Sequence, residues 1–368
     1  MIVGVPKEIK TDEARVGLTP TAVRELVHHG HRVLVETKAA FAIGLDDDQY
    51  AAAGGIIVDS ATEVFARAQM VVKVKEPQPS ELAMLREDQV IFTYLHLAAD
   101  APQARGLQES GCVAIAYETV TDARGGLPLL APMSEVAGRM SIQVGAHCLE
   151  LHQGGRGMLL GGVPGVQAAD VVILGGGVVG TNAARMAMGL EARVTVIDKS
   201  LPRLYALDLQ FGATLNTIYA TVDSIEQQVM DADLVIGAVL VTGATAPRLV
   251  DRTLLQRMRR GAVVVDVAID QGGCFETSRP TTHRSPTYVE EGVVHYCVAN
   301  MPGAVPRTST FALGNATLPF VLAIANKGWK QALREDPHLM AGLNVYRGAI
   351  THEAVATAVG TLFTPAQF

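Results

Sequence analysis

Short apolar runs alternate with longer segments of helical apolar spacing along almost the whole chain. The short runs are rich in Val and Ile and nearly continuous in hydrophobicity, which is typical of parallel strands covered on both faces. This alternation predicts a doubly wound α/β fold. The predicted strands are Ile2–Val5, His31–Val35, Met70–Lys75, Val90–Leu95, Val113–Tyr117, Val171–Leu174, Val194–Ile197, Leu234–Gly237, Ala262–Val267 and Val293–Cys297.

The segments between these runs predict helices and a division of the chain. A long helical stretch begins at Ser134, a good N-cap residue, and reaches about Gln153. We therefore expect a domain boundary near residue 130 and the end of the following domain near residue 306. Residues 307–368 carry helical patterns without a strand, so we expect them to pack back on one of the two domains. Shorter helices are predicted at Thr19–His28, Ala61–Ala68, Gln103–Gly111, Gly180–Gly189 and Asp251–Met258.

A glycine-rich loop, Gly175-Gly-Gly-Val-Val-Gly180, directly follows a predicted strand and opens a helix. Its pattern is G-x-G-x-x-G, and the next predicted strand ends at Asp198. In that context the loop predicts a dinucleotide site, because the glycines let the backbone approach a pyrophosphate at a helix N-terminus. Asp198 would bind ribose hydroxyls and repel a 2′-phosphate, which favours NAD over NADP. The alternative is a glycine-rich turn without a ligand.

Composition narrows the class of protein. The chain has 368 residues, enough for two domains, and its 49% hydrophobic and 18% charged residues indicate a globular protein. The net charge of −7 argues against nucleic acid or an anionic membrane as the main partner. We see no signal peptide and no apolar run of about 18 residues, so cytoplasm is the default. The four cysteines form no C-x-x-C pair, and we expect buried reduced thiols rather than disulfides or metal ligands.

Several predicted strands end in polar residues, and ligands of open α/β sheets bind beyond the carboxyl ends of strands. His96 could give or take a proton near neutral pH, although a strand-end histidine is often structural. Lys75 could hold a carboxylate or carbonyl oxygen, and the alternative is snorkelling at a sheet edge. The strand-end candidates are Lys75, His96, Glu118, Asp198 and Asp270.

Two further residues are candidates by chemistry. Arg15 precedes a predicted helix, and its guanidinium suits bidentate binding of a carboxylate, although a loop arginine is often only solvated. Asp270 precedes Gln271-Gly-Gly, where its carboxylate could face a nicotinamide and the reacting carbon. The alternative is an aspartate that forms a turn before glycine.

Taken together and in this order, the segments resemble bacterial NAD-dependent alanine dehydrogenases over essentially the whole chain. The same superfamily includes the NAD-binding α subunit of proton-translocating transhydrogenase and lysine-forming saccharopine dehydrogenase. The segments that carry the resemblance are Pro6-Lys-Glu-Ile-Lys, Glu13-Ala-Arg-Val-Gly-Leu-Thr-Pro, Lys73-Val-Lys-Glu-Pro, Tyr94-Leu-His-Leu, Ala131-Pro-Met-Ser-Glu-Val-Ala-Gly-Arg, the glycine loop, Asp266-Val-Ala-Ile-Asp-Gln-Gly-Gly and Val298-Ala-Asn-Met-Pro-Gly-Ala-Val-Pro.

The resemblance implies a fold of two Rossmann-like domains with parallel sheets, linked by long helices, with the active site in the inter-domain cleft. Residues 1–129 and 307–368 would form a discontinuous substrate or catalytic domain. Residues 130–306 would form the NAD-binding domain. Family members are typically homohexamers that act in amino-acid metabolism, so the resemblance implies a homo-oligomer. It also implies a reaction that requires no metal.

The resemblance also assigns roles in the substrate site. His96 would be the general acid and base, and Asp270 would hold the ammonium or water and assist proton transfer. Arg15 would bind the substrate carboxylate, and Lys75 would hold the keto oxygen or the carboxylate. Tyr94, Met133 and Asn300 would line a small pocket that admits a methyl side chain.

For the cofactor, the resemblance implies a second set of residues. One departure from the family is Ala220, where many relatives carry Ser; the neighbouring Thr221 is the candidate replacement. The implied NAD-binding residues are Ser134, Gly175, Gly177, Val178, Val179, Gly180, Asp198, Arg203, Val239, Leu240, Val267, Ala268, Ile269, Asp270, Arg279, Val298, Ala299, Asn300 and Met301.

The implied reaction is the reversible conversion of L-alanine, NAD⁺ and water into pyruvate, ammonium and NADH. One alternative is the NAD-binding α-type module of a transhydrogenase, and another is an NAD-binding regulator without activity. The polar set of Lys75, His96 and Asp270 favours the dehydrogenase.

Overall fold

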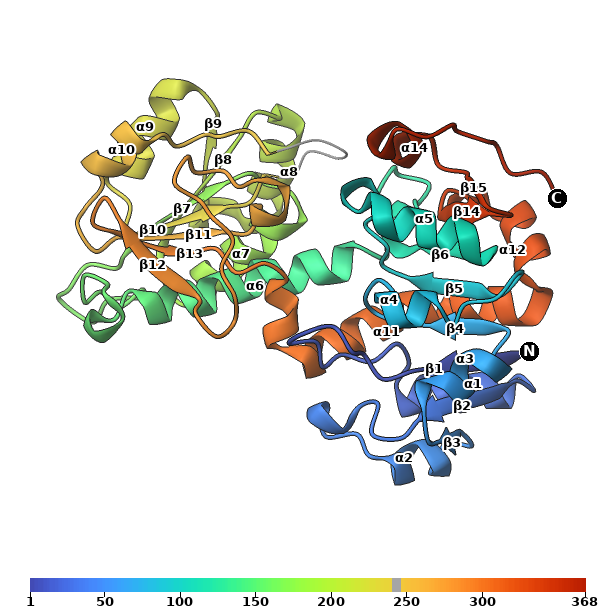
Figure 1. The fold of residues 1–368 in the computed structure, drawn as a ribbon. Helices are drawn as coiled ribbons and strands as arrows, with labels where there is room; N and C mark the ends of the chain where they lie inside the picture. Colours follow the sequence, from blue (N-terminus) through green and yellow to red (C-terminus); the bar gives the residue numbers. More distant parts are fainter. Residues whose placement is uncertain (240–245) are drawn as a thin grey trace. The chain divides into compact units, whose positions relative to one another are not determined.

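The computed structural model of the protein describes residues 1–239 and 246–368. These residues form two compact units, shown in Figure 1. The first unit comprises Met1–Met133 and Val305–Phe368, and the second comprises Ser134–Ala304. Each unit contains a mostly parallel sheet covered by helices, so the predicted α/β class is confirmed.

The sheet of the first unit has the strand order β15-β14-β6-β5-β4-β1-β2-β3 within the described residues. Its strands from β1 to β6 pair in parallel, whereas β14 pairs antiparallel with β6 and with β15. The strands are β1 (Ile2–Val5), β2 (Arg32–Glu36), β3 (Ile56–Val58), β4 (Met70–Val72), β5 (Val90–Thr93), β6 (Val113–Ala116), β14 (Leu343–Tyr346) and β15 (Ala349–Ile350).

The expectation of a C-terminal segment without strands is wrong. β14 and β15 form a hairpin around Arg347 and Gly348, which both have positive φ. The run that forms β14 is short and contains a polar residue, Asn344, which hides it from the hydrophobic pattern. The Nδ2 group of the buried Asn344 donates to the Thr119 hydroxyl at 2.8 Å and to the Gly342 carbonyl at 2.9 Å, whereas its Oδ1 accepts no hydrogen bond from a described residue.

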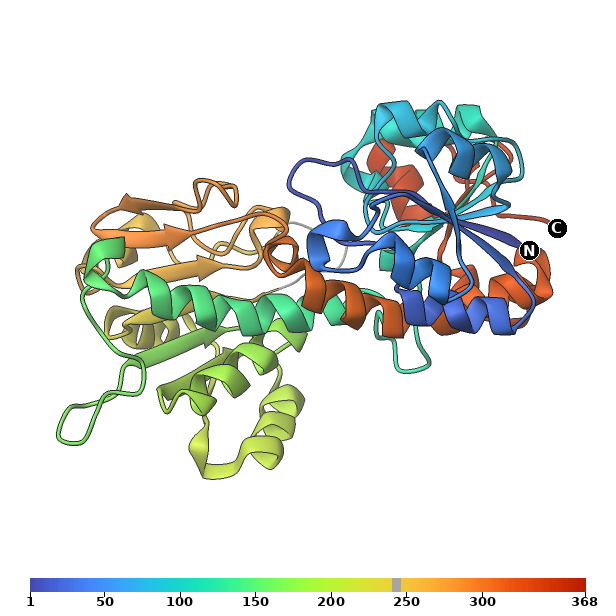
Figure 2. The same ribbon diagram turned by 90° about the horizontal axis from the view of Figure 1, so that it is seen from below.

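Helices cover both faces of this sheet. A core cluster joins Val71, Ile91 and Val345 of the sheet to α3, α5 and α14. Figure 2 shows α1 and α11 on the opposite face. The helices of the unit are α1 (Pro20–His28), α2 (Asp47–Ala52), α3 (Ala61–Arg67), α4 (Pro79–Leu82), α5 (Ala101–Ser110), α11 (Pro306–Lys327), α12 (Trp329–Glu335), α13 (Pro337–Met340) and α14 (Glu353–Val359).

The sheet of the second unit has the order β12-β13-β11-β10-β7-β8-β9 within the described residues. All its pairings are parallel except that of β12 with β13. The sequence pattern missed β9 and β12, whose residues are largely half-exposed or exposed, so they lack a continuous apolar run. The strands are β7 (Asp170–Leu174), β8 (Arg193–Asp198), β9 (Asn216–Tyr219), β10 (Leu234–Gly237), β11 (Val263–Asp266), β12 (Thr287–Glu290) and β13 (Val293–Tyr296).

The long helix α6 (Ala131–Cys148) begins in the first unit and continues into the second. The expectation that Ser134 caps this helix is wrong, because the helix starts three residues earlier. Pro132 permits this start, since the first turn needs no N–H from proline. The other helices of the second unit are α7 (Val178–Gly189), α8 (Leu201–Phe211), α9 (Val222–Met230) and α10 (Arg252–Arg257).

Helix α11 is long and apolar enough to cross a membrane by length and composition alone, with a mean hydropathy of 1.4. The sequence pattern missed this because Ser, Thr and Asn interrupt the apolar residues. The helix packs inside the first unit, where Ser309, Leu313 and Val321 are buried and the Thr310 hydroxyl accepts from the Val16 N–H. These contacts are those of a core helix, so the segment is weak support for a membrane span.

All four cysteines, Cys112, Cys148, Cys274 and Cys297, are buried free thiols, which confirms the expected burial. Burial raises the pKa of Cys112 and of Cys148 to about 11. Such thiols stay protonated at neutral pH, so they fill the core rather than act as nucleophiles.

The two sheets share one arrangement of their first five parallel strands. The order β3-β2-β1-β4-β5 in the first unit matches β9-β8-β7-β10-β11 in the second. In each sheet the order in which the parallel strands are added reverses between two neighbouring strands, β1 and β4 in the first unit and β7 and β10 in the second. Ligands of such sheets bind beyond the strand ends at this switch point.

Candidate functional site

Arg15 lies in the loop after β1 and is 2% exposed. Its guanidinium makes a two-pronged ion pair with Glu13: Nε donates to Oε1 at 2.7 Å and Nη2 donates to Oε2 at 2.5 Å. Nη1 donates to the Met133 sulfur at 3.1 Å. Burial opposes the charge on Glu13, yet the hydrogen bonds and charge of Arg15 lower the pKa of Glu13 to about 2. The guanidinium orientation is therefore fixed by Glu13.

Lys75 follows β4 and is partly buried. Among the described residues, no hydrogen bond or ion pair engages its ammonium. Burial lowers the pKa of Lys75, and the positive charges of Arg15 and Lys10 add to this against the charges of Glu76 and Glu13. An unpaired cation beside an arginine is suited to an anionic ligand.

His96 follows β5, the neighbour of β4 in the sheet. Its φ of 51° lies in the left-handed region, which a non-glycine residue rarely adopts. The Glu118 carboxylate holds this backbone, because it accepts from the His96 N–H at 2.6 Å and from the Leu95 N–H at 3.2 Å. The exposed imidazole stacks on the Tyr94 ring with centroids 5.7 Å apart. Tyr94 itself is buried, and its hydroxyl donates to the Leu129 carbonyl at 2.5 Å.

The glycine loop of the second unit fits close approach of a phosphate. Gly175 has a φ of 101°, and a Cβ on Gly180 would lie 1.8 Å from the Gly175 carbonyl oxygen. Both positions therefore require glycine for the turn itself. A Cβ on Gly177 would meet no atom within 4 Å, so this glycine leaves open space. Gly177 is also the N-cap of α7 and supplies no side chain to occupy the first N–H groups of the helix.

Asp198 ends β8 and ties the glycine loop to the next helix. Its Oδ2 accepts from the Gly176 N–H at 2.7 Å, and its Oδ1 accepts from the Ser200 N–H at 2.8 Å. Arg203 of α8 donates through Nε to the Gly176 carbonyl at 2.5 Å and through Nη2 to the Thr181 hydroxyl. The acidic residue expected at the ribose therefore also stabilises the loop. Thr221 caps α9 through its hydroxyl and Ser224, so that hydroxyl is already engaged.

Asp270 lies in a short 3-10 turn (Ile269–Gln271) after β11, which ends at Asp266 rather than at Val267. The Asp270 side chain is exposed and makes no hydrogen bond or ion pair with another described residue. The loop that carries it is anchored by the buried Asp266, which accepts from the Ala268 N–H at 3.1 Å, the Cys274 N–H at 2.8 Å and the Ser278 hydroxyl at 2.5 Å. Burial raises the pKa of Asp266, against these hydrogen bonds.

The remaining candidates of the second unit differ in accessibility. Val298 and Met301 are buried, and Asn300 has a φ of 60° just before the turn Met301–Ala304. Arg279 is exposed and lies over the Tyr288 ring at 3.8 Å, with Glu290 3.7 Å from Nη1. Arg279 is thus engaged by its own unit. Ser134, Val239, Val267 and Ala268 are half-buried, and Leu240 lies outside the described residues.

The first unit brings Arg15, Lys75, His96 and Met133 to one end of its sheet, and the second unit brings the glycine loop, Asp198 and Asp270 to one end of its own. The sequence identified Glu118 as a strand-end candidate, but it did not indicate that Glu13, Glu118 and Asp266 are the carboxylates that hold these groups. Glu13 and Asp266 lie inside the recognised segments, and Glu118 stands at a strand end, so their positions were visible but not their partners.

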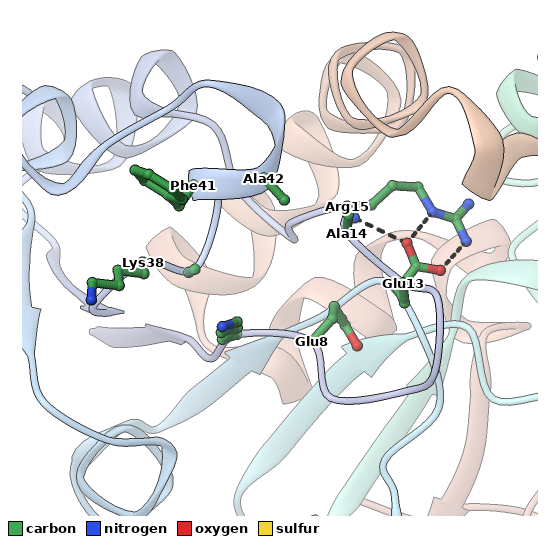
Figure 3. Close-up of a pocket in the computed structure, with 9 residues that line it drawn as sticks. Glu8, Glu13, Ala14, Arg15, Lys38, Phe41 and Ala42 are labelled. Atoms are coloured by element: carbon green, nitrogen blue, oxygen red, sulfur yellow. Dashed lines mark hydrogen bonds and ion pairs between the residues drawn. The ribbon is translucent and has the colours of Figure 1, made fainter.

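A pocket of about 150 Å³ in the first unit is drawn in Figure 3. It contains Arg15 and Glu13, whose ion pair is visible there, but neither Lys75 nor His96 lines it. The pocket therefore borders the candidate site without containing its proton-transfer group. Its lining residues are Lys7, Glu8, Glu13, Ala14, Arg15, Lys38, Ala39, Phe41 and Ala42.

The chain was compared with family models and with known proteins, and the matches agree on one family. Residues 4–137 match the model described as "Alanine dehydrogenase/PNT, N-terminal domain", and residues 141–353 match "Alanine dehydrogenase/PNT, C-terminal domain". The chain is 57% identical to an alanine dehydrogenase of Halomonas elongata, covering 100% of this chain and 99% of that protein. It is 54% identical to the alanine dehydrogenase of Bacillus subtilis, covering 100% and 97%.

Solved structures agree with these matches. An L-alanine dehydrogenase structure superposes with a TM-score of 0.95 at 53% identity and covers 98% of this chain and 99% of that one. A transhydrogenase of Sinorhizobium meliloti gives a TM-score of 0.84 at 22% identity, over 95% of this chain and 100% of that one, and shows a shared fold. The chain belongs to the alanine dehydrogenase/PNT family.

Proposed function

We propose that the protein is an NAD-dependent alanine dehydrogenase. It converts L-alanine, NAD⁺ and water into pyruvate, ammonium, NADH and a proton, and it catalyses the reverse reaction. The full-length relatives at 52–57% identity are named alanine dehydrogenases, and no feature of the described residues favours the transhydrogenase alternative.

The observation that carries this proposal is the set of groups at the switch point of the first unit. The Lys75 ammonium is unpaired among the described residues, it lies within the field of the Arg15 guanidinium, and the next strand of the sheet ends beside the exposed imidazole of His96. Two cations and one proton carrier suit a 2-oxo acid, whose carboxylate and keto oxygen both accept hydrogen bonds.

The residues of the second unit fit NAD. The open space at Gly177 and the uncapped N–H groups of α7 suit a diphosphate, and the Asp198 carboxylate suits ribose hydroxyls. Val178, Val179, Val239 and the segments 267–270 and 298–301 complete the proposed binding surface. When bound, NAD supplies the hydride acceptor, and the protein supplies orientation.

The proposed roles of the side chains follow the proton balance of the reaction. Arg15 binds the substrate carboxylate, and Lys75 binds the keto oxygen and stabilises negative charge that develops there. Ammonia attacks the carbonyl carbon, and loss of water from the carbinolamine needs a proton on the departing oxygen. His96 delivers that proton, and in the opposite direction it takes one from the attacking water. Asp270 holds the ammonium or the water and assists this transfer.

The substrate is proposed to have a methyl side chain. Tyr94 and Met133 bring apolar surface next to His96 and Arg15, because the Tyr94 ring stacks on the imidazole and the Met133 sulfur contacts the guanidinium. Asn300 is the proposed polar contact from the second unit. Larger side chains would crowd this surface and lower kcat/KM.

The proposal extends to a cytoplasmic protein that assembles as a homo-oligomer, a hexamer by the family resemblance. Light scattering of the purified chain tests the oligomer.

The experiment that tests the function is an assay of NADH oxidation with pyruvate, in the presence and absence of ammonium. We expect turnover only when both are present, and slower turnover with a 2-oxo acid of longer side chain. Absence of ammonium-dependent turnover with pyruvate and with every other small 2-oxo acid would overturn the proposal.

A further inference from the structure

A buried cluster of three charges lies next to Lys75 without belonging to the substrate site. The Lys73 ammonium donates to Glu8 Oε2 at 3.0 Å and to Glu81 Oε1 at 2.7 Å. The three side chains are between 0% and 2% exposed. Removing such charges from water is expensive, and an apolar residue of similar volume would often be at least as stable. The cluster therefore calls for an explanation other than stability.

One explanation is the backbone that the cluster holds. The second oxygen of Glu8, Oε1, accepts from the Val74 N–H at 2.7 Å and from the Lys75 N–H at 3.3 Å. β4 ends at Val72, so these N–H groups lie beyond the regular strand. Glu81 also anchors the start of α4, because its Oε2 accepts from the Gln78 N–H at 2.8 Å. Lys73 thus connects, through Glu8, to the backbone that carries Lys75.

A second explanation is that each carboxylate near Lys75 is already paired with another cation. Glu13 is paired with Arg15, and Glu76 is paired with Lys10. Glu8 and Glu81 are both paired with Lys73. Each of these carboxylates therefore has another cation, and within the described residues Lys75 is left without an ion pair. Of the two glutamates in the cluster, Glu8 is the one expected to form an ion pair with the Lys75 ammonium if Lys73 is removed, because it already accepts from the Lys75 N–H.

We propose that Lys73 is a positioning residue for Lys75. By engaging Glu8, it holds the Val74–Lys75 backbone in place and keeps the Glu8 carboxylate from pairing with the Lys75 ammonium, which stays available for the substrate. This inference rests on the proposed function, in which Lys75 binds the 2-oxo acid, and it assigns a role to a lysine that does not itself touch substrate.

Lys73→Met tests this by removing the cation while keeping an unbranched side chain. Glu8 is then free to pair with Lys75, and we expect the KM for pyruvate to rise about tenfold or more, with a smaller change in kcat. The KM for NADH should not change, because the glycine loop belongs to the second unit. Lys73→Arg retains the positive charge and should keep the KM for pyruvate within about threefold of the wild-type value.

Double variants separate this role from a general loss of packing. Lys73→Met with Glu8→Gln removes the carboxylate that would capture Lys75 but keeps an amide oxygen for the Val74 N–H. We expect it to recover most of the lost affinity for pyruvate. Lys73→Met with Glu81→Gln is the matched control, since Glu81 does not contact the Lys75 backbone, and it should recover less. Equal recovery in both double variants would overturn the proposal.

The wild-type assay separates failure of this inference from failure of the proposed function. If the wild type shows no ammonium-dependent turnover of pyruvate, the proposed function fails. If the wild type is active and Lys73→Met leaves the KM for pyruvate unchanged, the inference on Lys73 fails. Should Lys73→Met not fold by circular dichroism, Glu8→Ala decides: it removes the acceptor of the Val74 N–H, and an unchanged KM for pyruvate contradicts the proposal.

Discussion

The two units use one strand order and place opposite chemistry at the switch point. In the first unit the loop after β1 leads to Glu8, Glu13 and Arg15, and Lys75 follows β4. In the second unit the loop after β7 consists of glycines, and the open space at Gly177 is free of side-chain atoms. One switch point therefore offers charged side chains, and the other offers bare backbone.

This difference follows from what each site is proposed to bind. A small 2-oxo acid has few atoms, so side chains must reach it, and their orientation must be fixed by partners such as Glu13 and Glu118. A diphosphate is large and anionic, so a helix N-terminus and close backbone approach suffice. The topology supplies the location in both units, and the residues after the strands decide the ligand.

The largest expected effect is a loss of turnover without a loss of NADH affinity, which would separate the proton-transfer step from cofactor binding. His96→Ala should lower turnover by about 10²–10⁴-fold, because the proton transfer loses its carrier. The affinity for NADH should persist, since His96 belongs to the first unit. Steady-state kinetics and fluorescence titration with NADH measure the two quantities. His147→Ala, at an exposed histidine of the second unit, is the control and should keep turnover. Wild-type turnover in His96→Ala would remove the role of His96.

Asp270→Ala should have an effect of similar size on turnover. Its carboxylate is exposed and has no partner among the described residues, so its removal should leave the thermal midpoint unchanged. Asp266→Ala is the contrasting variant, since it removes the acceptor of the Cys274 N–H and the Ser278 hydroxyl and should lower that midpoint. Differential scanning fluorimetry distinguishes them. Undiminished turnover in Asp270→Ala would contradict its assignment.

A pair of glycine variants distinguishes Gly177, proposed to leave space for the diphosphate, from Gly180, which the turn itself requires. Gly177→Ala places a methyl group in open space, so it should weaken NADH binding about tenfold or more while the thermal midpoint stays unchanged. Gly180→Ala forces a Cβ against the Gly175 carbonyl oxygen and should destabilise the unit by about 1–3 kcal/mol. Calorimetry of NADH binding and thermal unfolding measure both. Unaffected NADH binding in Gly177→Ala would contradict a diphosphate at this loop.

Variants of Asp198 test the one side chain proposed to select the cofactor at the glycine loop of the second unit. Asp198→Ala should lower the preference for NADH over NADPH, since the charge that repels a 2′-phosphate is gone. It should also lower the thermal midpoint, because the Gly176 and Ser200 N–H groups lose their acceptor. Asp198→Asn keeps an acceptor oxygen, so it should show the change in preference with less loss of stability. If kcat/KM keeps its NADH to NADPH ratio in both variants, discrimination lies elsewhere.

The last prediction concerns the stability that the Glu13–Arg15 pair supplies. The pKa of Glu13 in the folded protein, about 2, lies below its ordinary value of 4.5. Its contribution to the free energy of unfolding is therefore present above about pH 4.5 and is lost as the pH falls toward 2. The contribution is at most about 3 kcal/mol. Urea unfolding of wild type and Glu13→Gln should show a difference that shrinks over this window; a constant difference would contradict the pKa.

The sequence predicted those parts of the fold that repeat a period. Parallel strands such as β1 and β10 are continuous apolar runs, and their predicted bounds match the structure. The edge strand β12 and the inner strand β14 contain polar residues whose partners are brought near only by folding, so no local period marks them. Ser134 is a good N-cap by type, yet the helix begins earlier at Ala131.

The candidate site shows the same division. Lys75 is the last residue of one predicted strand and His96 directly follows another, so position alone identifies them. The partners that hold them do not follow from spacing, because Glu8 and Glu118 bind backbone N–H groups that only folding brings near. Lys73 begins one of the segments that carry the family resemblance, yet the sequence alone indicates no partner for it. Lys73 is buried in an ion cluster with Glu8, 65 residues earlier in the chain, and Glu81, 8 residues later.

The central claim is that hydride passes directly between a nicotinamide and the carbon that becomes Cα of alanine. Its most direct test is turnover of pyruvate and ammonium with NADH that carries deuterium at the transferable position, followed by mass spectrometry and NMR of the product. We predict L-alanine with one deuterium at Cα. Alanine without deuterium, or loss of the deuterium to water, would contradict the account.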